Sequence, residues 1–161
     1  MKEKIITAAE GEHLLLKHNA FFCLMLGMVI SGDFLYVMLK TLSAASWVIT
    51  LVASLYALAI LILLLTMFKV SKYSGGSNKR AFWYGDFKDE FSAFLNHKGY
   101  KYSCNALVFC LIATWGFSDI DDFSAWFNAI ELNHYAAALV CLGMWSYALP
   151  VLLGLRAEQD E

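Results

Sequence analysis

Residues 41–68 read TLSAASWVITLVASLYALAILILLLTMF, and no charged residue interrupts them. About 20 apolar residues in helical form cross the hydrocarbon core of a bilayer, so this stretch is long enough to span a membrane. The whole chain has the same character, because 60% of its 161 residues are hydrophobic and 16% are charged. Soluble domains contain roughly 45–50% apolar and about 25% charged residues. The composition therefore predicts an integral membrane protein.

Three further apolar stretches lie between clusters of charge. Residues 102–118 carry no charge, residues 132–155 carry only a histidine, and residues 19–39 carry only Asp33. Each approaches the length of a spanning helix. The sequence predicts an all-α polytopic membrane protein with one domain, residues 1–161. Its four transmembrane helices form two hairpins, with spans at 19–39, 47–68, 102–118 and 132–155.

The charge on the connections predicts the orientation. The connection at 69–101 carries seven basic and three acidic residues, whereas 119–131 carries four acidic residues and no basic one. Basic connections stay on the cytoplasmic side. We expect a multi-pass protein of a bacterial-type inner (plasma) membrane, with both termini cytoplasmic. Glu3, Glu10 and Glu12 disfavour a cleavable signal peptide, which begins with basic residues. Residues 1–18 are expected to be a lead-in helix that runs into the first span.

The cytoplasmic connection contains the one sizeable element outside the spans. Residues 71–80, SKYSGGSNKR, read as a flexible tether. An amphipathic helix is predicted at 87–98, with Asp86 as its N-cap and Gly99 as its stop. Its apolar face consists of Phe87, Phe91, Phe94 and Leu95, at helical spacing.

Three interpretations of this amphipathic helix stay open. It lies on the inner membrane surface, or docks a cytoplasmic protein by its aromatic face, or packs under its own bundle. Phe82 and Trp83, just upstream, are typical of an interfacial anchor, and Lys79 and Arg80 suit anionic headgroups. The predicted partner- or membrane-binding residues are Phe82, Trp83, Phe87, Phe91, Phe94, Leu95, Lys79 and Arg80.

Asp33 has two interpretations. If the first span is 19–39, Asp33 lies about 6 Å from the midplane, and an ionisable group at that depth indicates function. His134 is then its best partner, with Asn19 and Asn105 as further intramembrane polar residues. If the span begins nearer Leu14, Asp33 lies at the outer boundary and residues 34–40 form an interfacial turn.

Ligand-binding patterns are weak in this sequence. The four cysteines fall inside predicted spans and form no CxxC pair, so they read as apolar packing residues. Acidic residues at 119–122 suit the start of a short helix better than a cation site. We expect no metal, no cofactor, no nucleic acid and no small-molecule substrate, and no catalytic constellation is present.

The sequence favours a non-enzymatic membrane subunit that self-associates and couples the membrane to a cytoplasmic partner through its 69–101 connection. Gly27 with Ser31, and Ala53 with Ala57, offer small-xxx-small faces for a homo-oligomer. Toxin-immunity proteins and membrane components of phage-defence systems share this general shape, an analogy of shape alone. The alternative is an oligomeric ion channel or proton-linked carrier that uses Asp33 and His134.

Overall fold

The computed structural model describes residues 7–43, 45–73, 79–118, 120 and 131–159, and these contain helices and no strand. The helices are α1 (Ala8–Thr41), α2 (Ser46–Tyr73), α3 (Lys79–Tyr84), α4 (Glu90–Phe117) and α6 (Leu132–Gln159). Among the described residues, three helices are long and apolar enough to cross a membrane, and they cover Ala8–Lys40, Ser46–Tyr73 and Leu132–Glu158. The all-helical class and the membrane class are therefore supported.

The first helix is longer than its predicted span because a capping box starts it early. The Thr7 hydroxyl accepts from the Glu10 N–H at 3.2 Å, and the Glu10 carboxylate accepts from the Thr7 N–H at 2.9 Å. From there α1 runs without a break for 34 residues, as expected for a lead-in helix that continues into the span. The interfacial turn considered for residues 34–40 is wrong, since the helix continues to Thr41.

The amphipathic helix and the third span are one helix, which corrects two predictions. The N-cap of α4 is Asp89 and not Asp86, and its side chain accepts from the Ser92 N–H. Gly99 does not end the helix, and its missing side chain lets α6 approach. A Cβ there would lie 2.7 Å from Val151 Cγ2 and 2.8 Å from Tyr147 Cδ2. Packing against α6 thus overrides the stop signal.

The predicted tether at 71–80 is also partly helical. The end of α2 reaches Tyr73, and α3 begins at Lys79. Residues 74–78 lie outside the described residues, as does most of the short helix considered for the connection that follows α4.

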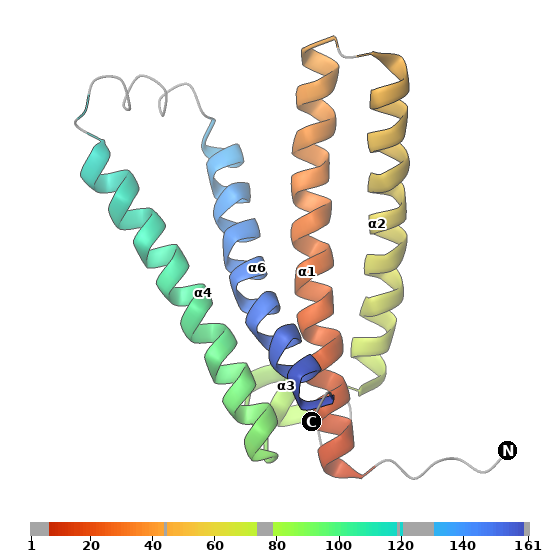
Figure 1. The fold of residues 1–161 in the computed structure, drawn as a ribbon, viewed down its shortest axis with the longest axis vertical. Helices are drawn as coiled ribbons and strands as arrows, with labels where there is room; N and C mark the ends of the chain where they lie inside the picture. Colours follow the sequence, from red (N-terminus) through yellow and green to blue (C-terminus); the bar gives the residue numbers. More distant parts are fainter. Residues whose placement is uncertain (1–6, 44, 74–78, 119, 121–130, 160–161) are drawn as a thin grey trace, which may run out of the picture.

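The long helices form a row in the order α2, α1, α6, α4 (Figure 1). The contacts follow this order, because α1 packs against α2 and α6, α6 packs against α4, and α1 meets α4 only briefly. The long helices share two ends, and the short helix α3 lies at the end where α1 starts and α6 finishes (Figure 1). We call this the basal end, and the opposite end the distal end.

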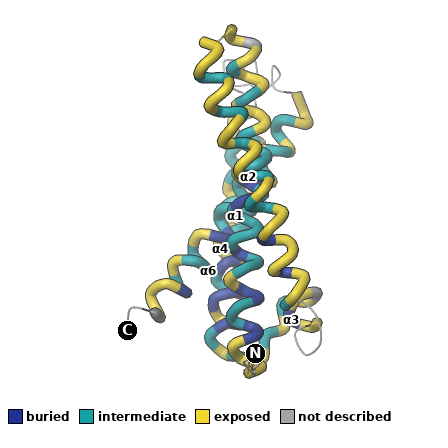
Figure 2. The backbone as a smooth tube through the Cα atoms, turned by 90° about the vertical axis from the view of Figure 1, so that its right-hand side faces the viewer, coloured by how far each residue is buried: buried dark blue, intermediate teal, exposed yellow. Residues whose placement is uncertain are grey.

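Buried residues gather mostly toward the basal end (Figure 2). One cluster joins α1, α4 and α6, and a second joins α1 to α2 and α3. The core residues of the first cluster are Leu16, Ala20, Leu95, Tyr147, Val151 and Leu155, and those of the second are Leu15, Val70 and Ala81. The helices are therefore held most firmly at the basal end, and α4 leans away from α1 toward the distal end (Figure 1).

Candidate functional site

A buried carboxylate ties α1 to the start of α4. Glu12 is 2% exposed, and its Oε2 atom accepts hydrogen bonds from the backbone N–H groups of Lys88 and Asp89, at 2.8 and 2.9 Å. A buried carboxylate is tolerated when such donors satisfy it. Because the two donors lie more than seventy residues away in the chain, this contact fixes where α4 begins relative to α1.

Asp89 adds a second carboxylate at the same place. Its side chain accepts from the Ser92 N–H at 2.9 Å, as an N-cap does. The hydroxyl and the backbone N–H of Ser92, together with nearby His13, hold the pKa of the Asp89 carboxyl below its usual value. The ionised form of Asp89 is therefore the one that the folded basal end favours.

A second buried polar contact lies between α4 and α6. The Tyr147 hydroxyl donates to Asn96 Oδ1 at 2.8 Å, and Asn96 Nδ2 donates to the Gly85 carbonyl at 3.4 Å. Gly85 has a φ of +66°, and a Cβ there would lie 2.9 Å from Asn96 Nδ2. Glycine suits this position best, on both counts. The Asn19 side chain of α1 lies beside the same Tyr147 hydroxyl.

Two open hollows lie beside the contact of Glu12 with the start of α4, with volumes of about 510 and 500 Å³. They share Ala9 and Asp89 as lining residues. The first is bounded on one side by His13 and Glu158, whose Nδ1 and Oε2 atoms are 3.7 Å apart. Their full lining is Ala8, Ala9, Glu10, Glu12, His13, Leu14, Lys88, Asp89, Glu90, Phe91 and Glu158. The lining of these hollows is thus mainly acidic, although the predicted connection is basic.

The predicted aromatic docking face is largely internal. Leu95 is buried, and Phe87 and Phe91 are half-buried against the core clusters, whereas Phe94 is 61% exposed. Of the three interpretations of this helix, packing within its own bundle fits these three side chains. Leu95 and Phe91 lie on the face of α4 that packs against α1 and α6, and Phe87, which precedes α4, packs against both core clusters.

The residues predicted to anchor the chain at the membrane surface, at 79–83, differ in their exposure and contacts. Phe82 is 38% exposed, and Lys79 is exposed at the start of α3. Arg80 forms an ion pair with Asp86 at 2.9 Å, and both side chains are largely exposed. Trp83 belongs to α3, and its side chain lies outside the described part of the chain.

The intramembrane polar residues are not brought together. Among the described residues no hydrogen bond or ion pair joins Asp33 to His134. Asp33 is exposed, and its neighbour Phe34 meets the His134 ring edge-on at 5.4 Å. His134 Nδ1 lies 3.8 Å from Glu131 Oε2 in the same segment. Asn19 is half-buried near Tyr147, whereas Asn105 is exposed on α4.

Three side chains instead donate to backbone carbonyls across the middle of the row. Ser103 Oγ donates to the Gly143 carbonyl at 2.9 Å, which sets the register of α4 on α6. Cys141 Sγ donates to the Gly27 carbonyl at 3.5 Å, and Trp145 Nε1 donates to the Leu24 carbonyl at 3.3 Å. Interhelical bonds of this kind stabilise helix packing within a membrane.

Sequence reasoning missed the two buried polar contacts of the basal end. In the sequence, Glu12 only disfavours a signal peptide, and Asn96 lies in the predicted helix at 87–98 with no sign of its partner. A signal for Glu12 was its place two residues before the apolar run that begins at Leu14. Among the described residues no group of three or more His, Cys, Asp or Glu side chains could hold a metal ion. The chain matches no protein-family model, no curated protein and no solved structure.

Proposed function

We propose that the chain is a non-enzymatic membrane subunit that couples the bilayer to a cytoplasmic protein through its basal end. In this proposal α1, α2, α4 and α6 all cross the membrane as two hairpins. The basal end faces the cytoplasm of a bacterial-type cell. Lys17, Lys69, Lys72, Lys101 and Arg156 are exposed at or near that end, as the positive-inside rule requires.

The hydrogen-bonded basal end is the observation that carries the proposal. Glu12 joins α1 to the start of α4, and Asn96 joins α4 to α6 through Tyr147. These bonds give the basal surface a fixed shape, and the interhelical hydrogen bonds of Ser103, Cys141 and Trp145 hold the middle of the row. A preorganised surface costs less entropy when a partner binds.

The surface also indicates the chemistry of the partner. Glu10, Glu90 and Glu158 are exposed, and Asp89 lines both hollows. An acidic rim around apolar Leu14 and Phe91 suits a segment that carries basic and apolar side chains. The proposed contact is therefore the pair of basal hollows, in place of the predicted aromatic face, where Leu95 is buried and Phe87 and Phe91 are half-buried.

Site-specific photo-crosslinking in living cells tests this proposal. A photo-reactive amino acid at Glu10 is expected to give one discrete adduct with a soluble protein, and the same probe at Glu131 on the distal end none. Glu10→Lys together with Glu158→Lys, with the probe at Ala9, should abolish the adduct, while Glu131→Lys leaves it intact. If the probe at Glu10 gives no adduct, or if the adduct survives the charge reversals at Glu10 and Glu158, the basal end does not bind a cytoplasmic protein in this way.

A further inference from the structure

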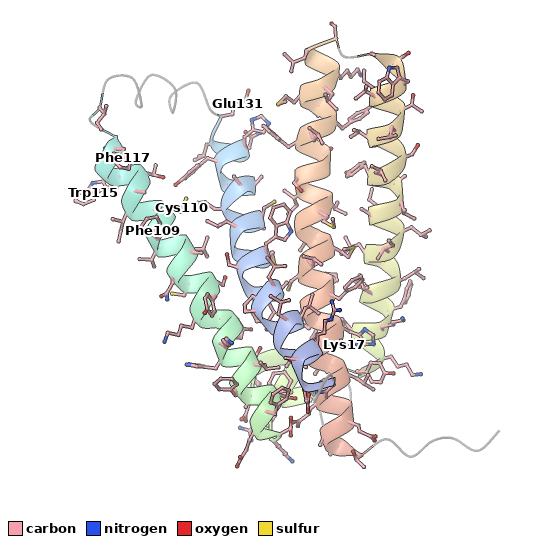
Figure 3. The ribbon with its side chains drawn as sticks, in the orientation of Figure 1. Lys17, Phe109, Cys110, Trp115, Phe117 and Glu131 are labelled. Carbon is pink, nitrogen blue, oxygen red and sulfur yellow. The ribbon has the colours of Figure 1, made fainter. Side chains whose placement is uncertain are left out.

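A cluster of cationic side chains lies where α1 and α2 meet at the basal end. The His18 ring of α1 stacks on the Tyr73 ring of α2, with the ring centres 5.5 Å apart and an angle of 18° between their planes. Lys72 Nζ lies 5.9 Å from the centre of the Tyr73 ring. Lys17, in the basal part of α1 (Figure 3), and Lys69 are close enough to act electrostatically on the His18 ring. Three ammonium groups from two helices thus lie around one ring pair.

No acidic side chain neutralises these lysines. Among the described residues, none of Lys17, Lys69 and Lys72 forms an ion pair with a carboxylate. The sequence of α2 contains no acidic residue. Arg80, in contrast, is paired with Asp86 at 2.9 Å. Because like charges held close together repel one another, the cluster gains free energy when an anion joins it.

The spacing along α1 and α2 places the cluster at the depth of phospholipid headgroups. From Lys17 to Lys40 on α1, and from Ser46 to Lys69 on α2, the helix rises about 34 Å at 1.5 Å per residue. The hydrocarbon core of a bilayer is about 30 Å thick. Both helices are long and apolar enough to cross it. When they do so, Lys17 and Lys69 lie in one headgroup layer, and Lys40 lies in the other.

An apolar stripe on α2 leads into the cluster. Leu61, Leu65 and Phe68 are 53, 55 and 75% exposed. Lys72 follows them at helical spacing, so the four side chains lie on one face of α2. A phospholipid has its parts in the same order, with acyl chains beside the apolar residues and a phosphate beside the cation. A free phosphate ion would gain nothing from the stripe.

We infer that the junction of α1 and α2 at the basal end binds an anionic phospholipid, whose phosphate is held by Lys17, Lys69 and Lys72. Basic pockets between membrane-spanning helices bind anionic headgroups in this way. The stacked rings of His18 and Tyr73 join the two helices, which keeps ammonium groups from both at one place. The inference uses only α1 and α2, and it does not depend on the proposed binding of a cytoplasmic protein.

Native mass spectrometry of the full-length chain in detergent, titrated with phosphatidylglycerol, tests this site. The wild type is expected to bind phosphatidylglycerol at least about tenfold more tightly than zwitterionic phosphatidylcholine. Lys17→Gln together with Lys69→Gln should weaken binding of the first phosphatidylglycerol about tenfold or more, since each lysine contributes about fivefold. The matched control, Lys101→Gln together with Arg156→Gln, removes the same charge from α4 and α6. Its affinity should stay within about threefold of the wild type.

A photoreactive phosphatidylglycerol, with its reactive group beside the phosphate, locates the bound lipid on the wild-type chain in membranes. Adducts are expected on the peptides that contain Lys17 and residues 69–73, and far fewer around Lys40 at the distal end of α1. Because this measurement needs no substitution, it tests the site even if a variant is less stable. Lys17 and Lys69 are exposed, so the double variant should also keep the wild-type Tm.

The opposite results overturn the inference. Equal losses of affinity in the two double variants would mean that the total charge of the basal end attracts the lipid, without a site. Phosphatidylcholine that binds as tightly as phosphatidylglycerol would exclude recognition of an anionic headgroup. Displacement of the lipid by millimolar inorganic phosphate would make the cluster a site for a free anion. Adducts that lie mainly outside the two basal peptides would place the lipid elsewhere.

Discussion

Glu12→Ala is the substitution that most directly probes how the basal end is fixed. The Glu12 carboxylate is 2% exposed and accepts two backbone N–H groups, from Lys88 and Asp89. Alanine leaves both donors without their acceptor at the point where α4 begins. Those N–H groups precede the first turn of α4 and have no partner within the helix itself.

The expected loss follows from the number and type of these bonds. A hydrogen bond to a charged group contributes about 1.5–3 kcal/mol, and two are lost. One hollow beside Glu12 is open to solvent, so water replaces part of that stabilisation. We expect about 3 kcal/mol, or roughly a 100-fold rise in local opening. Glu12→Gln keeps a neutral acceptor and should lose about 1 kcal/mol.

Amide hydrogen exchange of Lys88 and Asp89, measured by NMR in detergent micelles, reads this opening directly. Protection of both amides should fall in the order wild type, Glu12→Gln, Glu12→Ala. Glu90→Ala removes an exposed carboxylate from the first turn of the same helix, so its effect should stay below about 1 kcal/mol. Protection that falls less than tenfold in Glu12→Ala, or equally in Glu12→Ala and Glu90→Ala, would refute the reasoning.

Two further predictions concern α4. Gly99→Ala should destabilise the chain by about 1–3 kcal/mol, because its Cβ would lie 2.7 Å from Val151 Cγ2. Gly116→Ala, with no atom within 4 Å, should stabilise it by up to about 1 kcal/mol, and equal Tm values for both would contradict this packing. The pKa of Asp89 is lowered in the folded state, so its stabilisation is complete above the unfolded-state pKa of about 4 and is lost as pH falls through the folded-state pKa. The Tm of Asp89→Asn should therefore fall less on acidification than that of the wild type. If Tm falls equally with pH in both chains, Asp89 does not contribute to the loss of stability in acid.

The helical class and the membrane class could be predicted from the sequence because apolar length is a property of the chain alone. Residues 47–68 lie within α2, and the turn expected between the first two helices lies where α1 ends and α2 begins. The run of the lead-in helix into the first span was also predictable, since no proline lies between Thr7 and Thr41. These features depend on composition and on local caps.

The continuity of α4 could not be predicted in the same way. A glycine after an amphipathic segment is a common C-terminal signal, and Gly99 fits it locally. What overrides it is the close approach of Tyr147 and Val151, which belong to another helix. Phe87, Phe91 and Leu95 pack against core residues of other helices, so their role depends on tertiary packing and not on periodicity.

The polar groups of this chain fall into two kinds, according to whether the chain satisfies them itself. Glu12 and Asn96 are buried and bonded within the chain, so they specify how its own helices meet. Asn105 is exposed on α4 and has no side-chain hydrogen bond within the described residues, so it does not set how the chain's own helices meet.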